Sequence, residues 1–117
     1  LFSDAISNPS YNLSRSDLER FHILTQFVLD AFDINFGNRI LNQIMRFVPV
    51  YVACGGNSSK ALDLMFARKV LRKLEGRFDD DLKANLVKLE KLILQHYNKT
   101  DFSATLEVIA RLKRKLL

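Results

Sequence analysis

Apolar and polar positions recur with a helical period of three to four residues from about residue 16 to the end of the chain. In the first such stretch, residues 16–35, two apolar rows leave only a narrow polar stripe, so we predict a helix that its neighbours largely surround. The segment Ser16-Asp17-Leu18-Glu19 fits a capping box at the start of this helix. The apolar rows are Leu18, Phe21, Val28, Leu29 and Phe32, and Leu24, Phe27, Ala31 and Ile34.

A second helix is predicted over residues 38–54. Gly37 can adopt a positive φ before it, and Asn38 can cap its first turn. Pro49 lacks a backbone donor, so we expect it to kink or divide the helix near Val48. Apolar residues occupy one side of this helix, and the opposite side is polar. The polar face consists of Arg39, Asn42, Gln43 and Arg46, at positions i, i+3, i+4 and i+7.

Three more helices are predicted, over residues 60–75, 80–97 and 103–116. The first should end at Gly76 in the C′ position, and Asp79 or Asp80 should cap the second. The residues expected to face the core are Leu64, Ala67, Leu71 and Leu74, then Leu82, Leu86, Leu89, Ile93 and Tyr97, then Leu106, Ile109, Leu112 and Leu116.

No stretch alternates with a period of two for long enough to predict a strand. The fold class is therefore predicted to be all-α, roughly a five-helix bundle with short antiparallel connections. Residues 1–13 show no sustained period and are interpreted as a linker or arm, so that the domain covers residues 14–117.

Composition narrows the class of protein. A chain of 117 residues with 48% apolar residues is long enough for one folded domain, and its net charge of +5 favours polyanionic partners. The single cysteine, Cys54, excludes an internal disulfide and suits a reducing compartment. The apolar run 47–54 is far shorter than the roughly 20 residues that span a bilayer. Because no signal peptide is visible and the chain starts at Leu1, we expect a cytoplasmic domain cut from a longer protein.

The residues usually responsible for catalysis or metal binding are sparse. No Gly-rich phosphate loop with a following Lys is present, and His22 and His96 lack a second ligand at metal spacing. Cys54, at the end of an apolar helix, is expected to pack in the core rather than act as a nucleophile. The acidic run 79–81 is interpreted as helix capping. We therefore predict no metal site and no catalytic centre in this chain alone.

Two basic features remain. Arg39 is predicted to lie in the first helical turn, where a cation opposes the helix dipole. It is therefore a candidate to bind an anion such as a nucleotide phosphate. The alternative is that its side chain simply points into solvent. The second feature is a C-terminal basic run, interpreted either as a solvated helix end or as a DNA contact. Its members are Arg111, Lys113, Arg114 and Lys115.

Two segments together resemble a known family. The first segment, residues 36–47, reads Phe-Gly-Asn-Arg-Ile-Leu-Asn-Gln-Ile-Met-Arg-Phe. It is similar to the Phe-Gly-x-Arg…Asn-Glu-Ile…Arg-Phe segment in the helical lid of McrB-like AAA+ NTPases, the motor subunits of modified-cytosine restriction systems. The second segment has two parts, which read Ala-Leu-Asp at residues 61–63 and Arg-Lys-Val-Leu-Arg-Lys-Leu-Glu-Gly at residues 68–76. They are similar, in the same order, to that family's Leu-Asp and Lys-x-Leu-Pro-Lys-Leu-x-Gly segments. The resemblance covers roughly residues 16–116. It departs from the family at Gln43, where Glu is common, and at Arg72, where Pro is.

The resemblance implies a C-terminal lid subdomain that hydrolyses nothing alone. Arg39 matches the lid arginine that senses nucleotide, with Asn38, Asn42, Gln43 and Arg46 as a candidate supporting polar face. This chain alone would bind no cofactor, and the intact parent would bind ATP or GTP with magnesium. Its partners would be its own AAA+ core domain, neighbouring subunits of a ring homo-oligomer, and a nuclease subunit and DNA, with no membrane. The alternative is a free-standing helical module that binds DNA or acts as an adaptor.

Overall fold

The computed structural model describes residues 14–34 and 37–116, with the side chain of Asn38 excepted, and this part of the chain forms five α-helices and no strand. The helices are α2 (Arg15–Phe32), α3 (Gly37–Ala53), α4 (Ser58–Met65), α5 (Leu82–His96) and α6 (Ser103–Lys115). A π-helical turn (Phe66–Val70) and a 3₁₀ turn (Leu71–Leu74) continue α4. The predicted all-α class is confirmed. The arm predicted at residues 1–13 lies outside the described residues.

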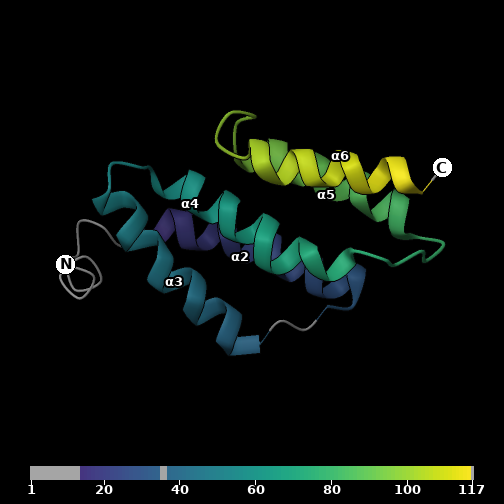
Figure 1. Ribbon diagram of the computed structural model, residues 1–117, viewed down its shortest axis with the longest axis horizontal. Helices are drawn as coiled ribbons and strands as arrows, with labels where there is room; N and C mark the ends of the chain where they lie inside the picture. The colour runs from purple at the N-terminus through teal and green to yellow at the C-terminus, as the bar shows by residue number, and fades with distance from the viewer. Residues whose placement is uncertain (1–13, 35–36, 117) are drawn as a thin grey trace.

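Helix α4 and its continuation occupy the middle of the molecule (Figure 1). They pack against α3 on one side and against α6, which pairs with α5, on the other. Helix α2 contacts both α4 and α5 and closes the remaining side of the core. The largest fully buried side chains come from all these elements. They include Leu24, Phe32, Ile44, Leu62, Phe66, Leu71, Leu86, Phe102 and Ile109.

Helix α2 begins two residues earlier than the capping box predicted. Ser14 is the N-cap, and its Oγ accepts a hydrogen bond from the Asp17 N–H at 3.1 Å, which leaves Ser16 inside the first turn. The helix ends at Phe32 rather than near residue 35, because Asp33 adopts a left-handed conformation with φ of 54°. The prediction of a capping box at Ser16 is therefore wrong, although a serine does cap this helix.

The outer face of α2 is more exposed than its apolar rows indicated. Leu18 and Leu29 are 42% and 40% exposed, whereas Phe21, Leu24 and Val28 are buried. Because α4 and α5 cover only one side of α2, the prediction that its neighbours largely surround it is wrong.

Helix α3 starts at Gly37, whose φ of +56° confirms the predicted positive φ. The helix continues through Pro49 to Ala53. Of the two expected effects of this proline, a kink or a division, the division does not occur. Cys54 follows in the turn and is exposed, which corrects the expectation that it packs in the core. The predicted cap by Asn38 rests on a side chain outside the described residues.

The continuation of α4 departs from regular α-helix. The Leu71 N–H donates to the carbonyl of Phe66, five residues earlier, and the Glu75 N–H donates to the carbonyl of Arg72, three residues earlier. The wider turn brings Phe66, Val70, Leu71 and Leu74 into the core together. Gly76 ends the segment with a φ of +80°, as predicted.

The change of helical register in this segment moves part of the predicted inner row out of the core. Leu64 and Ala67 are only half-buried and line a groove at the surface. They were predicted to be buried on the assumption of one uninterrupted α-helical period, and that assumption fails at the π turn.

The predicted apolar stripe of α5 is confirmed, since Leu82, Leu86, Leu89, Ile93 and Tyr97 are all buried. On α6, Ile109 and Leu112 are buried, and Leu106 and Leu116 are partly buried against the core. Asp81, rather than Asp79 or Asp80, occupies the N-cap position of α5, without a side-chain hydrogen bond. Asp79 instead accepts from Arg77.

A buried carboxylate joins α4 to α6. Asp63 is fully buried and accepts hydrogen bonds from the Ala104 N–H at 3.0 Å and the Thr105 N–H at 2.6 Å, in the first turn of α6. Lys60 donates to the same carboxylate at 2.7 Å, and the Thr105 hydroxyl donates to the carbonyl of Asp63 at 3.0 Å. Asp63 therefore caps α6 from another helix and holds α6 beside α4.

None of the helices within the described residues is both long and apolar enough to cross a membrane.

Candidate functional site

Arg39 lies exposed in the first turn of α3 and contributes to a groove of about 540 Å³. The opposite wall of this groove is the continuation of α4. The full lining is Arg39, Ile40, Gln43, Arg68, Lys69, Arg72 and Lys73, which we call the Arg39 groove. The structure thus places the arginine singled out from the sequence beside four further cations from another element.

Burial of the neighbouring apolar residues presents these four cations to solvent. Phe66, Val70, Leu71 and Leu74 anchor the segment in the core, while the pairs 68–69 and 72–73 remain exposed between them. The two pairs are four residues apart in the sequence, and all four side chains line the Arg39 groove. The π and 3₁₀ turns therefore hold two Arg-Lys pairs at the edge of the groove.

The Arg39 groove has positive charge without internal compensation. Among the described residues, five cations line it and no carboxylate does. Across residues 14–34 and 37–116, none of these five side chains forms an ion pair with Asp or Glu, whereas Arg20 and Arg77 do. Like charges held close together repel one another. A cation in the first turn of α3 also opposes the dipole of that helix, and this second effect costs about 0.3–1 kcal/mol. An anion bound in the groove would relieve both effects.

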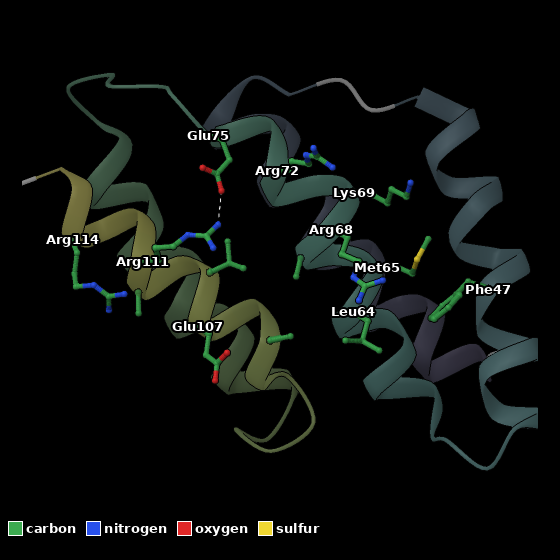
Figure 2. A pocket seen from close by; sticks show the side chains of 14 residues that line it. Phe47, Leu64, Met65, Arg68, Lys69, Arg72, Glu75, Glu107, Arg111 and Arg114 are labelled. Carbon is green, nitrogen blue, oxygen red and sulfur yellow. Dashed lines mark hydrogen bonds and ion pairs between the residues drawn. The ribbon is translucent and has the colours of Figure 1, made fainter.

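A second, larger groove of about 1340 Å³ separates the continuation of α4 from α6 (Figure 2). We call it the α6 groove. It shares Arg68, Lys69 and Arg72 with the Arg39 groove, and it adds Arg111 and Arg114. Its remaining lining is Phe47, Leu64, Met65, Ala67, Glu75, Ala104, Glu107, Val108 and Ala110.

An ion pair closes one end of the α6 groove. Arg111 donates to Glu75, as the dashed line in Figure 2 shows, and Lys115 approaches the same carboxylate at 3.4 Å. Desolvation raises the pKa of Glu75, but the charges of Lys115 and Arg111 outweigh it and hold this pKa below its usual range. Glu75 is therefore ionised at neutral pH and links the end of the α4 continuation to α6.

The C-terminal basic run is largely neutralised within the domain. Arg111 and Lys115 pair with Glu75, and Lys113 pairs with Glu90 at 3.3 Å. Of the four residues, only Arg114 has no carboxylate partner among the described residues. The run therefore presents less free charge to DNA than its sequence indicates.

A family model described as a domain of unknown function (DUF8727) matches residues 3–117. The chain belongs to this family. No curated protein and no solved structure matches the chain.

The structure brings together only part of the polar face predicted on α3. Gln43 joins Arg39 in the groove, whereas Asn42 and Arg46 are exposed and are not among the residues that line either groove. Asn38 has its side chain outside the described residues. No group of three or more His, Cys, Asp or Glu side chains in the described part of the chain is placed to hold a metal ion.

Sequence reasoning missed the cations that complete the Arg39 groove. Arg68, Lys69, Arg72 and Lys73 were noted only as part of a resembling segment. The available signal was the repetition of two basic pairs at a spacing of four residues, which places both pairs on one helical face.

Proposed function

We propose that this domain is the helical lid of an AAA+ NTPase, in which Arg39 contacts a phosphate of the nucleotide bound to a separate core domain. One structural observation carries the proposal: in the described part of the chain, Arg39 shares a groove with four other cations and no carboxylate. The resemblance of residues 36–47 and 68–76 to the lid of McrB-like AAA+ NTPases supplies the link to nucleotide.

The chemistry of the groove suits a phosphate chain. A guanidinium holds two phosphate oxygens at once through parallel N–H donors, so Arg39 can orient a terminal phosphoryl group. Lys69 and Lys73 would contribute positive charge nearby, and their ammonium groups do not require the fixed geometry that a planar guanidinium does. Charge that develops on the transferred phosphoryl group is thereby stabilised electrostatically, which is the main protein contribution in such reactions.

The two walls of the groove come from separate elements, and this suits a sensor. A phosphate held between α3 and the continuation of α4 would contact both walls, and its loss would leave the like charges facing each other. In our proposal this difference moves the lid relative to the core when nucleotide is hydrolysed.

The wider assignment follows from the same proposal. The lid hydrolyses nothing alone, and the intact parent binds ATP or GTP with magnesium. Neighbouring subunits of a ring, and a nuclease subunit and DNA, are its proposed partners, in the cytoplasm. The choice of base would be made by the core domain.

The function is tested by steady-state ATP and GTP hydrolysis in the full-length protein. We expect Arg39→Ala to lower kcat by about tenfold to a thousandfold, because one charge-stabilising contact to the transition state is lost. Arg39→Lys should retain part of the rate, because lysine keeps the positive charge but lacks the two parallel N–H donors of the guanidinium group. Arg46→Ala is the matched control, an exposed arginine on the same helix that is not among the groove-lining residues. Equal rates for the wild type and Arg39→Ala would refute the sensor role.

The alternative is a helical module that binds DNA through the same cations. The observation that favours it is the density of uncompensated charge in the Arg39 groove, which also fits a phosphate backbone. If all five cations contact phosphates, the logarithm of the binding constant for duplex DNA should fall against the logarithm of salt concentration with a slope of about −4.5. The lid proposal predicts weak or undetectable DNA binding by this chain.

A further inference from the structure

The α6 groove is most basic at one end. Arg72, Arg111 and Arg114 lie toward this basic end, and Leu64 lies toward the other end, where Arg68 and Glu107 are also placed (Figure 2). On α6 the lining runs from Ala104 through Glu107 and Val108 to Arg111 and Arg114. A ligand that fills this groove therefore meets apolar side chains next to guanidinium groups, with most of the guanidinium groups at one end.

Both ends of the groove are braced. Near the end at Leu64, Asp63 on α4 accepts from the first-turn N–H groups of α6 at Ala104 and Thr105. At the basic end, Glu75 binds Arg111 and Lys115. These contacts hold the two walls apart at a set spacing, so the groove exists before a ligand arrives. A preformed groove binds at a lower ordering cost than one that must open.

The length of the groove fits a short helix. Its lining on α6 runs from Ala104 to Arg114, which corresponds to about 15 Å at 1.5 Å per residue. A helical segment of about three turns has the same length. Grooves between two helices that present an apolar floor are a recurring way of holding an amphipathic helix.

The charge of the groove selects the polar part of the ligand. Five cations and two carboxylates line it, and Arg68, Arg72 and Arg114 have no carboxylate partner within residues 14–34 and 37–116. Guanidinium groups pair bidentately with carboxylates as well as with phosphates. The apolar floor decides between these ligands, because a phosphate backbone gains little by covering Leu64 and Val108, whereas an amphipathic helix buries its own apolar residues there.

We propose that the α6 groove binds an amphipathic helix of a partner protein, with its apolar residues over Leu64 and Val108 and its Asp or Glu residues against Arg68, Arg72 and Arg114. This site shares Arg68 and Arg72 with the Arg39 groove but does not include Arg39. It does not depend on the nucleotide proposal, because Leu64, Val108 and Arg114 line only the α6 groove.

The test uses the 117-residue chain and a displayed library of 16-residue helical peptides in which the residues of one face vary freely. Clones are sorted for binding to the wild type and against binding to the Val108→Asp variant. We expect the enriched face to carry apolar residues together with Asp or Glu, and the acidic residues to be most frequent toward the end that meets Arg72 and Arg114. Arg114→Glu should weaken the enriched peptides at least tenfold, and Lys91→Glu, an exposed charge reversal on α5, should change their affinity less than twofold.

Circular dichroism and thermal unfolding establish that each variant is folded. Arg114 is exposed, so its reversal tests the groove even if Val108→Asp unfolds the domain. Enrichment of basic or uncharged faces, or equal affinity for the wild type and Arg114→Glu, would overturn the proposal. A library that yields no binder, while a 12-nucleotide oligothymidylate binds and loses affinity in Arg114→Glu, would overturn it in favour of nucleic acid.

Discussion

Replacing Asp63 with alanine tests how the domain holds α6 in place. The carboxylate is fully buried and accepts hydrogen bonds from Ala104, Thr105 and Lys60. Its loss removes the cap of α6, which is typically worth about 1 kcal/mol. It also leaves the Lys60 ammonium and two N–H groups without this partner, at about 1–3 kcal/mol for an unsatisfied buried group.

These contributions overlap. Breaking a fully buried charged pair typically costs about 3–5 kcal/mol, and the cost here should not exceed that range, because Lys60 is 26% exposed and also donates to the Ser103 hydroxyl at 2.8 Å. We therefore expect Asp63→Ala to lower the free energy of unfolding by about 4 kcal/mol, a large share of the roughly 5–15 kcal/mol typical of a domain. Asp63→Asn keeps one acceptor oxygen, and we expect it to cost about half as much. The corresponding fall in Tm for Asp63→Ala is roughly 15 °C for a domain of this size.

The assay is urea unfolding followed by far-UV circular dichroism, with Asp80→Ala as the control. Asp80 is an exposed carboxylate, and its removal should change stability by less than about 0.5 kcal/mol. If Asp63→Ala costs less than about 1 kcal/mol at an unchanged m-value, Asp63 does not brace α6, and the rigid α6 groove loses its support.

Two further predictions concern buried polar groups. The Tyr97 hydroxyl is buried without a hydrogen-bond partner among the described residues, and burial raises the pKa of Tyr97 to about 12. Tyr97→Phe removes this hydroxyl and keeps the stacking on Phe102, so it should raise the free energy of unfolding by about 1 kcal/mol in denaturant titrations. A loss of stability would show that the hydroxyl has a partner in solution. Burial also raises the pKa of Asp17, but hydrogen bonds with Arg20, Ser58 and Ser14 outweigh it and hold that pKa below 3.8. The carboxylate therefore stabilises the fold above about pH 3.8 and loses this effect as the pH falls further. Below that pH, the Tm of the wild type should drop more steeply than the Tm of Asp17→Asn. Parallel curves of Tm against pH would contradict this.

The helices that pack on one face could be predicted well from the sequence. In α5, Leu82, Leu86 and Leu89 recur at the three- to four-residue period of a helix, and each of these leucines is buried as expected. The α4 continuation could not be predicted, because Phe66, Val70 and Leu71 reach the core together only through a π turn that depends on tertiary packing.

The candidate site was only partly predictable for the same reason. Arg39 attracted attention because a cation at a helix N-terminus is locally unfavourable, and that signal lies within one turn. Its proximity to Arg68 and Arg72 depends on how α3 packs against α4, which no local pattern reports. Asp63 was also read only as part of a resembling segment, although it proves to be the buried cap of α6.

The central claim is that the cations of the Arg39 groove contact the phosphates of a nucleotide held by the core domain. Its most direct test on this chain is an NMR titration at low salt with inorganic triphosphate, used as a probe for those contacts. We predict saturable shifts of the Arg39 and Gln43 signals and of residues 68–73, and a loss of affinity of at least fivefold in Arg39→Ala. Shifts confined to other surfaces, or no saturable shift at low salt, would contradict the account.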